Sequence, residues 1–243
     1  MTEVFGIIRL SALIGLALLL AACAGQPIQR KDGSTSAKSF SVKNLAKGDI
    51  DTVCETHQQE VLASLKTLAL KLYRRNPREW RKSGFASAEA ASEALFAPLS
   101  NWAESELRKR DWQASLNDAW REDFGGDRVR ALIDGLLVMV MASYGHQSEF
   151  FLLSELDAQK LYNSARNIEA VVWKLSNARA ANGDLFLLTN SMDPRTPANL
   201  SFEREFGKMI AIQDTLAKII EDKTNRAIRF GIVNLATLAF MPI

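Results

Sequence analysis

From residue 49 onward, apolar side chains recur every three or four positions, which is the spacing of one face of an α-helix. Residues 157–183 carry the most regular stripe, formed by Leu161, Ala165, Ile168, Val172 and Leu175. Residues 51–76 carry a second stripe, formed by Val61, Leu65, Leu68 and Leu72. No segment of the sequence sustains the apolar–polar alternation of a strand. The pattern therefore predicts an all-α fold, an irregular bundle of about six to eight helices.

Capping and helix-breaking residues divide this pattern into separate helices. Asp51 is the expected N-cap of the first helix, which ends before Pro77 because proline cannot continue a helix. Asn101 and Glu104 have the spacing of a capping box. They predict a helix that begins at residue 101 and restarts or kinks near Asp111.

The segment 128–144 is apolar on nearly every side, which is typical of a central helix. Asp127 is its expected N-cap after a break at Gly125-Gly126; the alternative is that these glycines and the helix N-terminus hold an anion. Asp134 lies within this segment, where an unpaired carboxylate would be costly. We expect it to pair with Arg130 one turn earlier. The alternative is a polar contact at a partner interface or in a ligand cavity.

An irregular stretch interrupts the helical pattern between residues 184 and 200, after an expected helix stop at Asn182-Gly183. Long irregular loops within compact domains are often functional. This loop is therefore the predicted contact surface, with Met192, Asp193, Arg195 and Asn199 as its candidate residues. A loop that merely crosses the end of the bundle is the alternative. Two further helices are expected after it, in 201–222 and 225–243.

The beginning of the sequence follows a different pattern. Residues 10–24 contain one polar side chain, Ser11, and follow Arg9. The run is shorter than the roughly 20 residues that a membrane-spanning helix needs, but it has the length of the apolar part of a secretory signal. Residues 23–48 lack periodicity and are rich in Ser, Gly and Lys, as in a flexible tether. The sequence thus divides into a signal peptide (1–22), a tether (23–48) and a single α-helical domain (49–243).

The apolar run ends in Leu20-Ala21-Ala22-Cys23, which resembles the lipobox of bacterial lipoproteins. The resemblance covers about the first 25 residues and implies cleavage before Cys23, a diacylglycerol thioether on its sulfur and an acylated new amino terminus. Several acyl chains together hold a protein firmly at a membrane. Ala24, where inner-membrane lipoproteins commonly have Asp, implies a location at the outer membrane, facing the periplasm.

Charge and cysteine content narrow the function classes. The formal net charge is +2, so the sequence gives no reason to expect a nucleic-acid partner. With Cys23 acylated, Cys54 has no intramolecular partner, and we expect it to pack in the core; an intermolecular disulfide is the alternative. Cys54 and His57 share a helix face but lack a third catalytic or ligating group. No catalytic residue, metal site or cofactor is predicted apart from the covalent lipid on Cys23.

The sequence therefore predicts a lipid-anchored accessory protein without enzymatic activity, a scaffold for an envelope complex whose protein partner is not identified. One alternative is a carrier that holds a lipid or a hydrophobic small molecule within the bundle. A second alternative is an enzyme whose site assembles from distant helices.

Overall fold

A computed structural model describes residues 47–151, 155–190 and 199–239, with residues 225–239 as backbone only. This described part of the chain consists of α-helices and short 3₁₀ segments and contains no strand, which confirms the predicted all-α bundle. The segment from Lys47 onward forms one compact unit. The predicted signal peptide, Cys23 and nearly all of the tether lie outside the described residues, as do Met192, Asp193 and Arg195.

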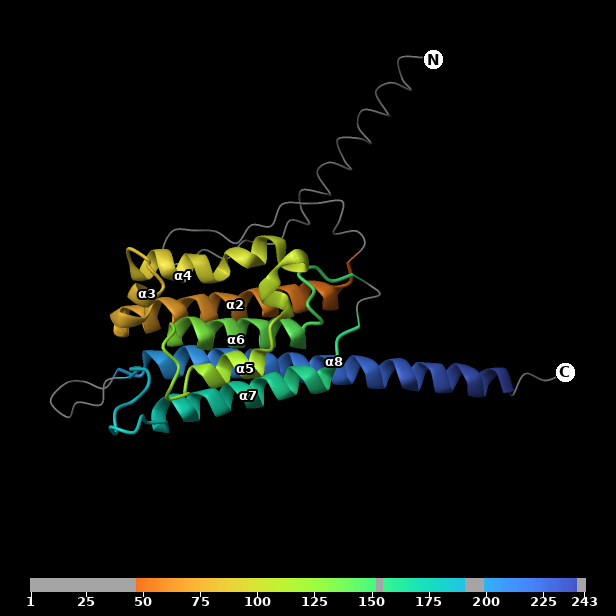
Figure 1. The fold of residues 1–243 in the computed structure, drawn as a ribbon. Coiled ribbons are helices and arrows are strands. Elements are labelled where there is room, and N and C mark those ends of the chain that lie inside the picture. The colour runs from red at the N-terminus through yellow and green to blue at the C-terminus, as the bar shows by residue number, and fades with distance from the viewer. Residues whose placement is uncertain (1–46, 152–154, 191–198, 240–243) are drawn as a thin grey trace, which may run out of the picture. The chain divides into compact units, whose positions relative to one another are not determined.

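The helices follow one another along the chain, and the two longest connections are residues 144–157 and 178–200 (Figure 1). The α-helices are α2 (Asp49–Arg75), α3 (Pro77–Lys82), α4 (Ala88–Phe96), α5 (Trp112–Asp118), α6 (Arg128–Ser143), α7 (Ala158–Asn177) and α8 (Ser201–Ala239). Two 3₁₀ segments, η2 (Ala97–Glu104) and η3 (Glu106–Lys109), connect α4 to α5. Among the described residues, no helix contains an apolar stretch long enough to cross a membrane.

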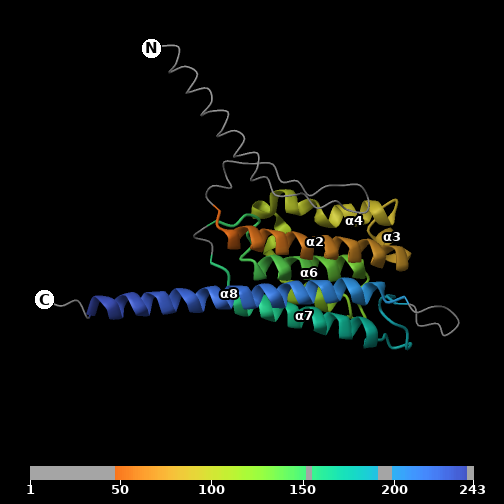
Figure 2. The same ribbon diagram turned by 180° about the vertical axis from the view of Figure 1, so that it is seen from behind.

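The core is built around α6, which is buried on nearly all sides as predicted. It packs against α2, α5 and α7, while α8 packs along α2 and α7. Figures 1 and 2 show α4 on the far side of α2 from α6. The apolar stripe expected in residues 201–222 is buried in α8 and consists of Phe202, Phe206, Met209, Leu216 and Ile220. The one cysteine among the described residues, Cys54, is free, so burial of these stripes is the main source of stability for this bundle.

Two predicted helix starts are wrong. The helix α2 begins at Asp49 after the N-cap Gly48, and the Asp51 carboxylate accepts a hydrogen bond from the Gly48 N–H at 2.7 Å. Asn101 lies within η2 with non-helical φ and ψ of −139° and 58°. Its side chain donates to the Glu104 carboxylate at 3.3 Å, so these two residues bond to each other and not to the backbone donors of a helix N-terminus.

The restart predicted near Asp111 is confirmed. The Asp111 carboxylate accepts hydrogen bonds from the N–H groups of Gln113 and Ala114 at 2.8 and 3.2 Å and caps α5. Two acceptor bonds satisfy N–H groups that a helix N-terminus leaves without intrahelical partners. The short helix α5 therefore has a fixed beginning, with Trp112 as its first residue.

Two predicted helix ends are also wrong. The helix α7 stops at Asn177, and Asn182-Gly183 lie in a tight turn closed by a 2.8 Å hydrogen bond from Ala180 N–H to the Asp184 carbonyl. Gly183 has a φ of +85°, so the Asn-Gly signal marks this turn and not the helix stop. The helix α8 continues to Ala239 without the expected break near residue 223, because no proline interrupts it.

Candidate functional site

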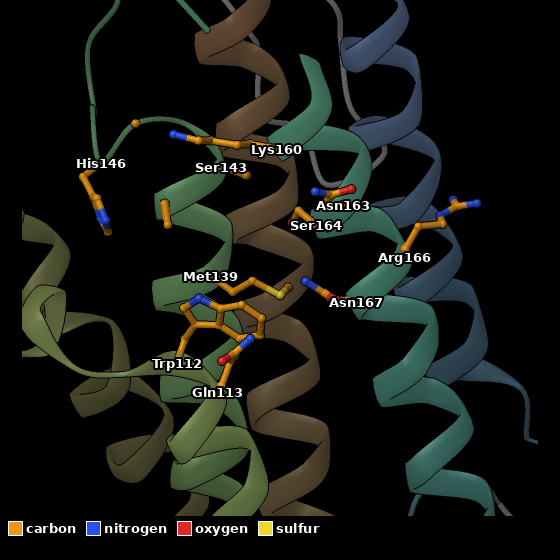
Figure 3. A pocket seen from close by; sticks show the side chains of 12 residues that line it. Trp112, Gln113, Met139, Ser143, His146, Lys160, Asn163, Ser164, Arg166 and Asn167 are labelled. Carbon is orange, nitrogen blue, oxygen red and sulfur yellow. The ribbon is translucent and has the colours of Figure 1, made fainter. Parts of the chain in front are cut away.

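A pocket of about 690 Å³ opens between α5, α6 and α7 (Figure 3). Its lining comes from α5, from the end of α6 with the turn that follows, and from one face of α7. The lining residues are Trp112, Gln113, Met139, Ala142, Ser143, Gly145, His146, Lys160, Asn163, Ser164, Arg166 and Asn167. Most of these side chains are polar, and none of them is a carboxylate.

The wall formed by α5 lies unusually close to α6 at Gly135. A Cβ atom at this position would lie 2.8 Å from the side chain of Leu116 and 3.0 Å from its backbone nitrogen. Only glycine permits this approach. The Arg128 guanidinium also donates to the carbonyls of Ala119 and Arg121, at 3.1 and 2.9 Å, just beyond the end of α5. These contacts fix the helix that presents Trp112 to the pocket.

Asp134 holds the beginning of α5 in place. Its carboxylate is buried and lies 3.6 Å from the Arg130 Nε, so the predicted pair is confirmed. It also lies 3.2 Å from the guanidinium of Arg110, just before α5, and this second partner was not predicted because it comes from a different element. Burial raises the pKa of Asp134 to about 6, against the opposing effect of the two arginines.

The turn after α6 places His146 at the pocket. The N–H groups of Gly145 and His146 donate to the carbonyls of Ala142 and Met141, at 3.0 and 2.7 Å, which is the hydrogen-bond pattern of a Schellman motif. Gly145 and His146 both have positive φ, at 64° and 58°. The backbone thus turns sharply, and His146 lines one edge of the pocket (Figure 3).

The imidazole of His146 stacks on Trp102, with ring centroids 5.9 Å apart. Within the described residues, neither the His146 Nδ1 nor the Trp102 Nε1 has a hydrogen-bond partner, although both atoms are buried. Burial lowers the pKa of His146, and the nearby charges of Arg108 and Lys160 lower it further. The neutral imidazole is therefore favoured, with ring nitrogens that can donate or accept a hydrogen bond.

A buried glutamine connects the floor of the pocket to α8. The side-chain amide of Gln213 is fully buried and donates to Ser143 Oγ at 3.1 Å and to Ser164 Oγ at 3.0 Å. Its own carbonyl oxygen has no partner among the described residues. The network fixes the two serines, which line the pocket from α6 and α7.

Two cations line the pocket, and they differ in their partners. Arg166 points toward α8, where it pairs with Asp214 at 2.7 Å, and it also pairs with Glu169 at 3.1 Å (Figure 3). Lys160 extends across one end of the pocket toward the turn that carries His146. Its ammonium makes no ion pair with any residue that the structure describes. Lys160 is therefore the cation available to a bound molecule.

The N-terminus of α6 does not provide an anion site. The Asp127 carboxylate accepts from the Arg130 N–H at 2.9 Å, which confirms the predicted cap. The Glu79 carboxylate accepts from the Arg128 N–H at 2.7 Å. Two carboxylates of the protein itself thus occupy the donors that an anion would need.

The other candidate residues named from the sequence do not meet at the pocket. Asn199 is exposed, and its side-chain oxygen accepts from the Ser201 N–H at 3.1 Å at the start of α8. Cys54 lies in the core as predicted, and burial raises the pKa of its thiol to about 11. The His57 ring bonds to the Val53 carbonyl at 2.8 Å. No group of three potential metal ligands occurs among the residues that the structure describes.

Sequence reasoning missed the polar lining from α7. Lys160, Asn163, Ser164 and Asn167 lie three or four positions apart and share one helix face. A polar stripe of this kind usually faces solvent. Here α5 and α7 both pack on α6, and the stripe becomes one wall of the pocket between them. Comparison of the chain with protein-family models, with curated proteins and with solved structures found no match.

Proposed function

We propose that this protein is a lipoprotein of the bacterial envelope, held at the outer membrane by an acylated Cys23, and that its helical domain binds a small molecule. The lipobox resemblance supports the anchor. The tether predicted for residues 23–48 would give the domain reach from the membrane surface. In this proposal the protein is a non-enzymatic accessory of the envelope, and its role is to bind that small molecule.

The observation that carries the binding role is the pocket between α5, α6 and α7. Its volume of about 690 Å³ falls within the range of small-molecule sites, which is about 300–1,000 Å³. Amide, hydroxyl, imidazole and ammonium groups converge on it from three elements. These groups favour a ligand that carries polar atoms over the lipid or hydrophobic molecule of the carrier alternative, because an acyl chain would leave them desolvated and unpaired.

Metabolic labelling with an alkyne fatty acid tests the anchor. We expect label on the natural chain, no label on a Cys23→Ser variant, and unchanged label on a Cys54→Ala variant, which is the matched control. Label that persists after the Cys23→Ser change would refute the anchor.

Native mass spectrometry of the full chain, released from mild detergent, tests the binding role. We expect the natural chain to retain a small molecule from the cell. An Ala142→Phe change fills the pocket and should abolish the added mass, whereas Ala170→Phe, on the exposed face of α7, should not. Equal retention by both variants, or no retained mass in the natural chain, would contradict the proposal.

A scaffold role is the second candidate, and one observation favours it. Tyr162 and Trp173 on α7 are large aromatic side chains with 46% and 65% of their surface exposed. Exposed aromatic residues are typical anchors of protein interfaces. A pull-down from solubilised envelopes should lose its partner after Trp173→Ser. Deletion of residues 191–199 tests the predicted contact surface in the same assay.

A further inference from the structure

We infer that the pocket between α5, α6 and α7 takes a small organic anion that carries a planar ring, with its charged group beside Lys160 and its ring against Trp112 and Met139. The inference rests on the binding role proposed above and names the class of ligand. It depends on how charge, hydrogen-bond donors and apolar surface are distributed along the pocket.

Charge favours an anion. The lining contains Lys160 and Arg166 and no carboxylate. Arg166 is already paired with Asp214, whereas the Lys160 ammonium has no ion-pair partner in the described part of the chain. The Asp157 carboxylate, one turn before Lys160, is bound by the backbone N–H groups of Gln159 and Lys160 at the start of α7. A cation without a partner at the mouth of a pocket attracts a negatively charged group.

The uncharged groups beside Lys160 also suit an anion. The side-chain oxygen of Asn163 accepts a hydrogen bond from Gln159 at 2.8 Å, which leaves the Asn163 NH₂ group as a donor. Asn163 is three residues from Lys160 on α7, so both groups project from one helix face. His146 approaches this end of the pocket from the opposite side, with a buried ring nitrogen that has no partner among the described residues (Figure 3). The neutral imidazole therefore adds a polar ring, and no charge, to the lining at this end.

The other end of the pocket requires a ligand with an apolar body. Trp112 and Met139 lie away from Lys160 in the close view (Figure 3). Both residues line the pocket, and Trp112, which is only half-buried, offers most of the apolar surface to an occupant. A volume of about 690 Å³ greatly exceeds what an inorganic ion fills. The Trp112 indole can stack on a flat ring, and the Met139 thioether makes favourable sulfur–aromatic contacts with one. The ligand class that satisfies both ends is an aromatic or similarly planar carboxylate.

Fluorine NMR titrations of the full chain in detergent with three matched probes test this inference. The probes are para-fluorobenzoate, para-fluorobenzyl alcohol and para-fluorobenzylamine, which share a ring and differ in charge. We expect the benzoate to bind at least about fivefold more tightly than the alcohol, and the amine to bind most weakly. Ala142→Phe should abolish binding of the benzoate.

A pair of lysine variants locates the charge effect. Lys160→Gln should lower the affinity for the benzoate by about three- to tenfold and leave that for the alcohol unchanged. Lys174→Gln is the matched control on the same helix, since Lys174 lies over Trp120 and does not line the pocket. A benzoate affinity that falls equally in both variants would overturn the inference.

The probes also separate this inference from the binding role itself. Equal affinity for all three, abolished by Ala142→Phe, overturns the anion preference and leaves the binding role intact. Tightest binding of the amine also overturns it. If no probe binds, the planar-anion class is wrong, while the mass spectrometry of the natural chain decides separately whether the pocket holds a ligand.

Discussion

The two ends of α6 differ in whether the buried polar groups around them have hydrogen-bond partners. At the N-terminal end, the Asp127 carboxylate is 7% exposed and accepts hydrogen bonds from the Tyr73 hydroxyl, the Ser83 hydroxyl and the Arg130 N–H, all at 2.9 Å. The Glu79 carboxylate beside it bonds to the Arg128 N–H. At this end the carboxylates accept hydrogen bonds from groups of the protein itself, so these donors and acceptors are already paired.

At the C-terminal end, several buried polar atoms have no partner within the described residues. They include the Tyr144 hydroxyl, the His146 Nδ1, the Trp102 Nε1 and the side-chain oxygen of Gln213. Buried polar atoms in folded proteins are nearly always hydrogen-bonded, so a local group of exceptions calls for a functional explanation. The pocket lies at this end. The polar groups at the start of α6 are therefore satisfied within the fold, whereas one residue of the unsatisfied group near its end, His146, lines the pocket.

Asp127→Ala should show the largest effect on stability. The change removes the cap of α6 and leaves the fully buried Tyr73 hydroxyl without its acceptor. A lost cap costs about 0.5–2 kcal/mol and an unsatisfied buried hydroxyl about 1–3 kcal/mol, so the free energy of unfolding should fall by roughly 1.5–5 kcal/mol. Chemical denaturation measures this change. A loss below about 1 kcal/mol would show that this end does not hold α6 in place.

Asp134→Asn should change how stability depends on pH. The pKa of Asp134 rises from 3.8 to about 6 on folding, so between these values the folded chain holds a proton that the unfolded chain releases. The stability of the natural chain therefore falls as the pH rises from about 4 to 6, by roughly 2–3 kcal/mol at 1.36 kcal/mol per pKa unit. The amide introduced by the substitution does not titrate in this range. Denaturation at pH 4 and pH 7 should show the variant gaining this amount relative to the natural chain, and a constant difference would contradict the shift.

Gly135→Ala should disturb both stability and the pocket. The added methyl group would meet Leu116 at 2.8 Å and must push α5 away from α6. Overpacking of this kind costs about 1–3 kcal/mol. Because α5 carries Trp112, affinity for the fluorobenzoate probe should fall as well. Gly207→Ala is the control, since nothing lies within 4 Å of a Cβ atom there. If the variant is destabilised but binds the probe with unchanged affinity, the prediction that ligand binding depends on the position of α5 is wrong.

The helical pattern was predictable because burial of an apolar stripe depends on local spacing. The stripe from Phe202 to Ile220 is buried throughout, and the restart at Asp111 follows from its side-chain chemistry. Helix ends were less predictable, since Asn182-Gly183 suits a turn as well as a helix stop. Local signals of this kind fix which segments are helical more firmly than where they end.

The pocket was not predictable from one sequence. Trp112, His146 and Asn163 come from three separate elements, and only tertiary packing brings them together. One signal was visible: Gln213 interrupts the apolar stripe of α8 between Met209 and Leu216. A polar residue at a core position indicates a polar partner nearby, which here is the pair of serines at the pocket floor.

His146→Asn should show the smallest effect on stability and a clear effect on binding. His146 has a φ of +58°, and asparagine is among the residues that tolerate this conformation, so the turn should persist. The lost stacking on Trp102 should cost about 1 kcal/mol or less. Affinity for the fluorobenzoate should nevertheless fall several-fold, because the imidazole that lines the pocket is gone. His57→Asn, on α2, should leave affinity unchanged. If the His146 variant binds the probe as tightly as the natural chain, the unpaired atoms at this end of α6 have no role in ligand contact, and the contrast between the two ends is one of packing alone.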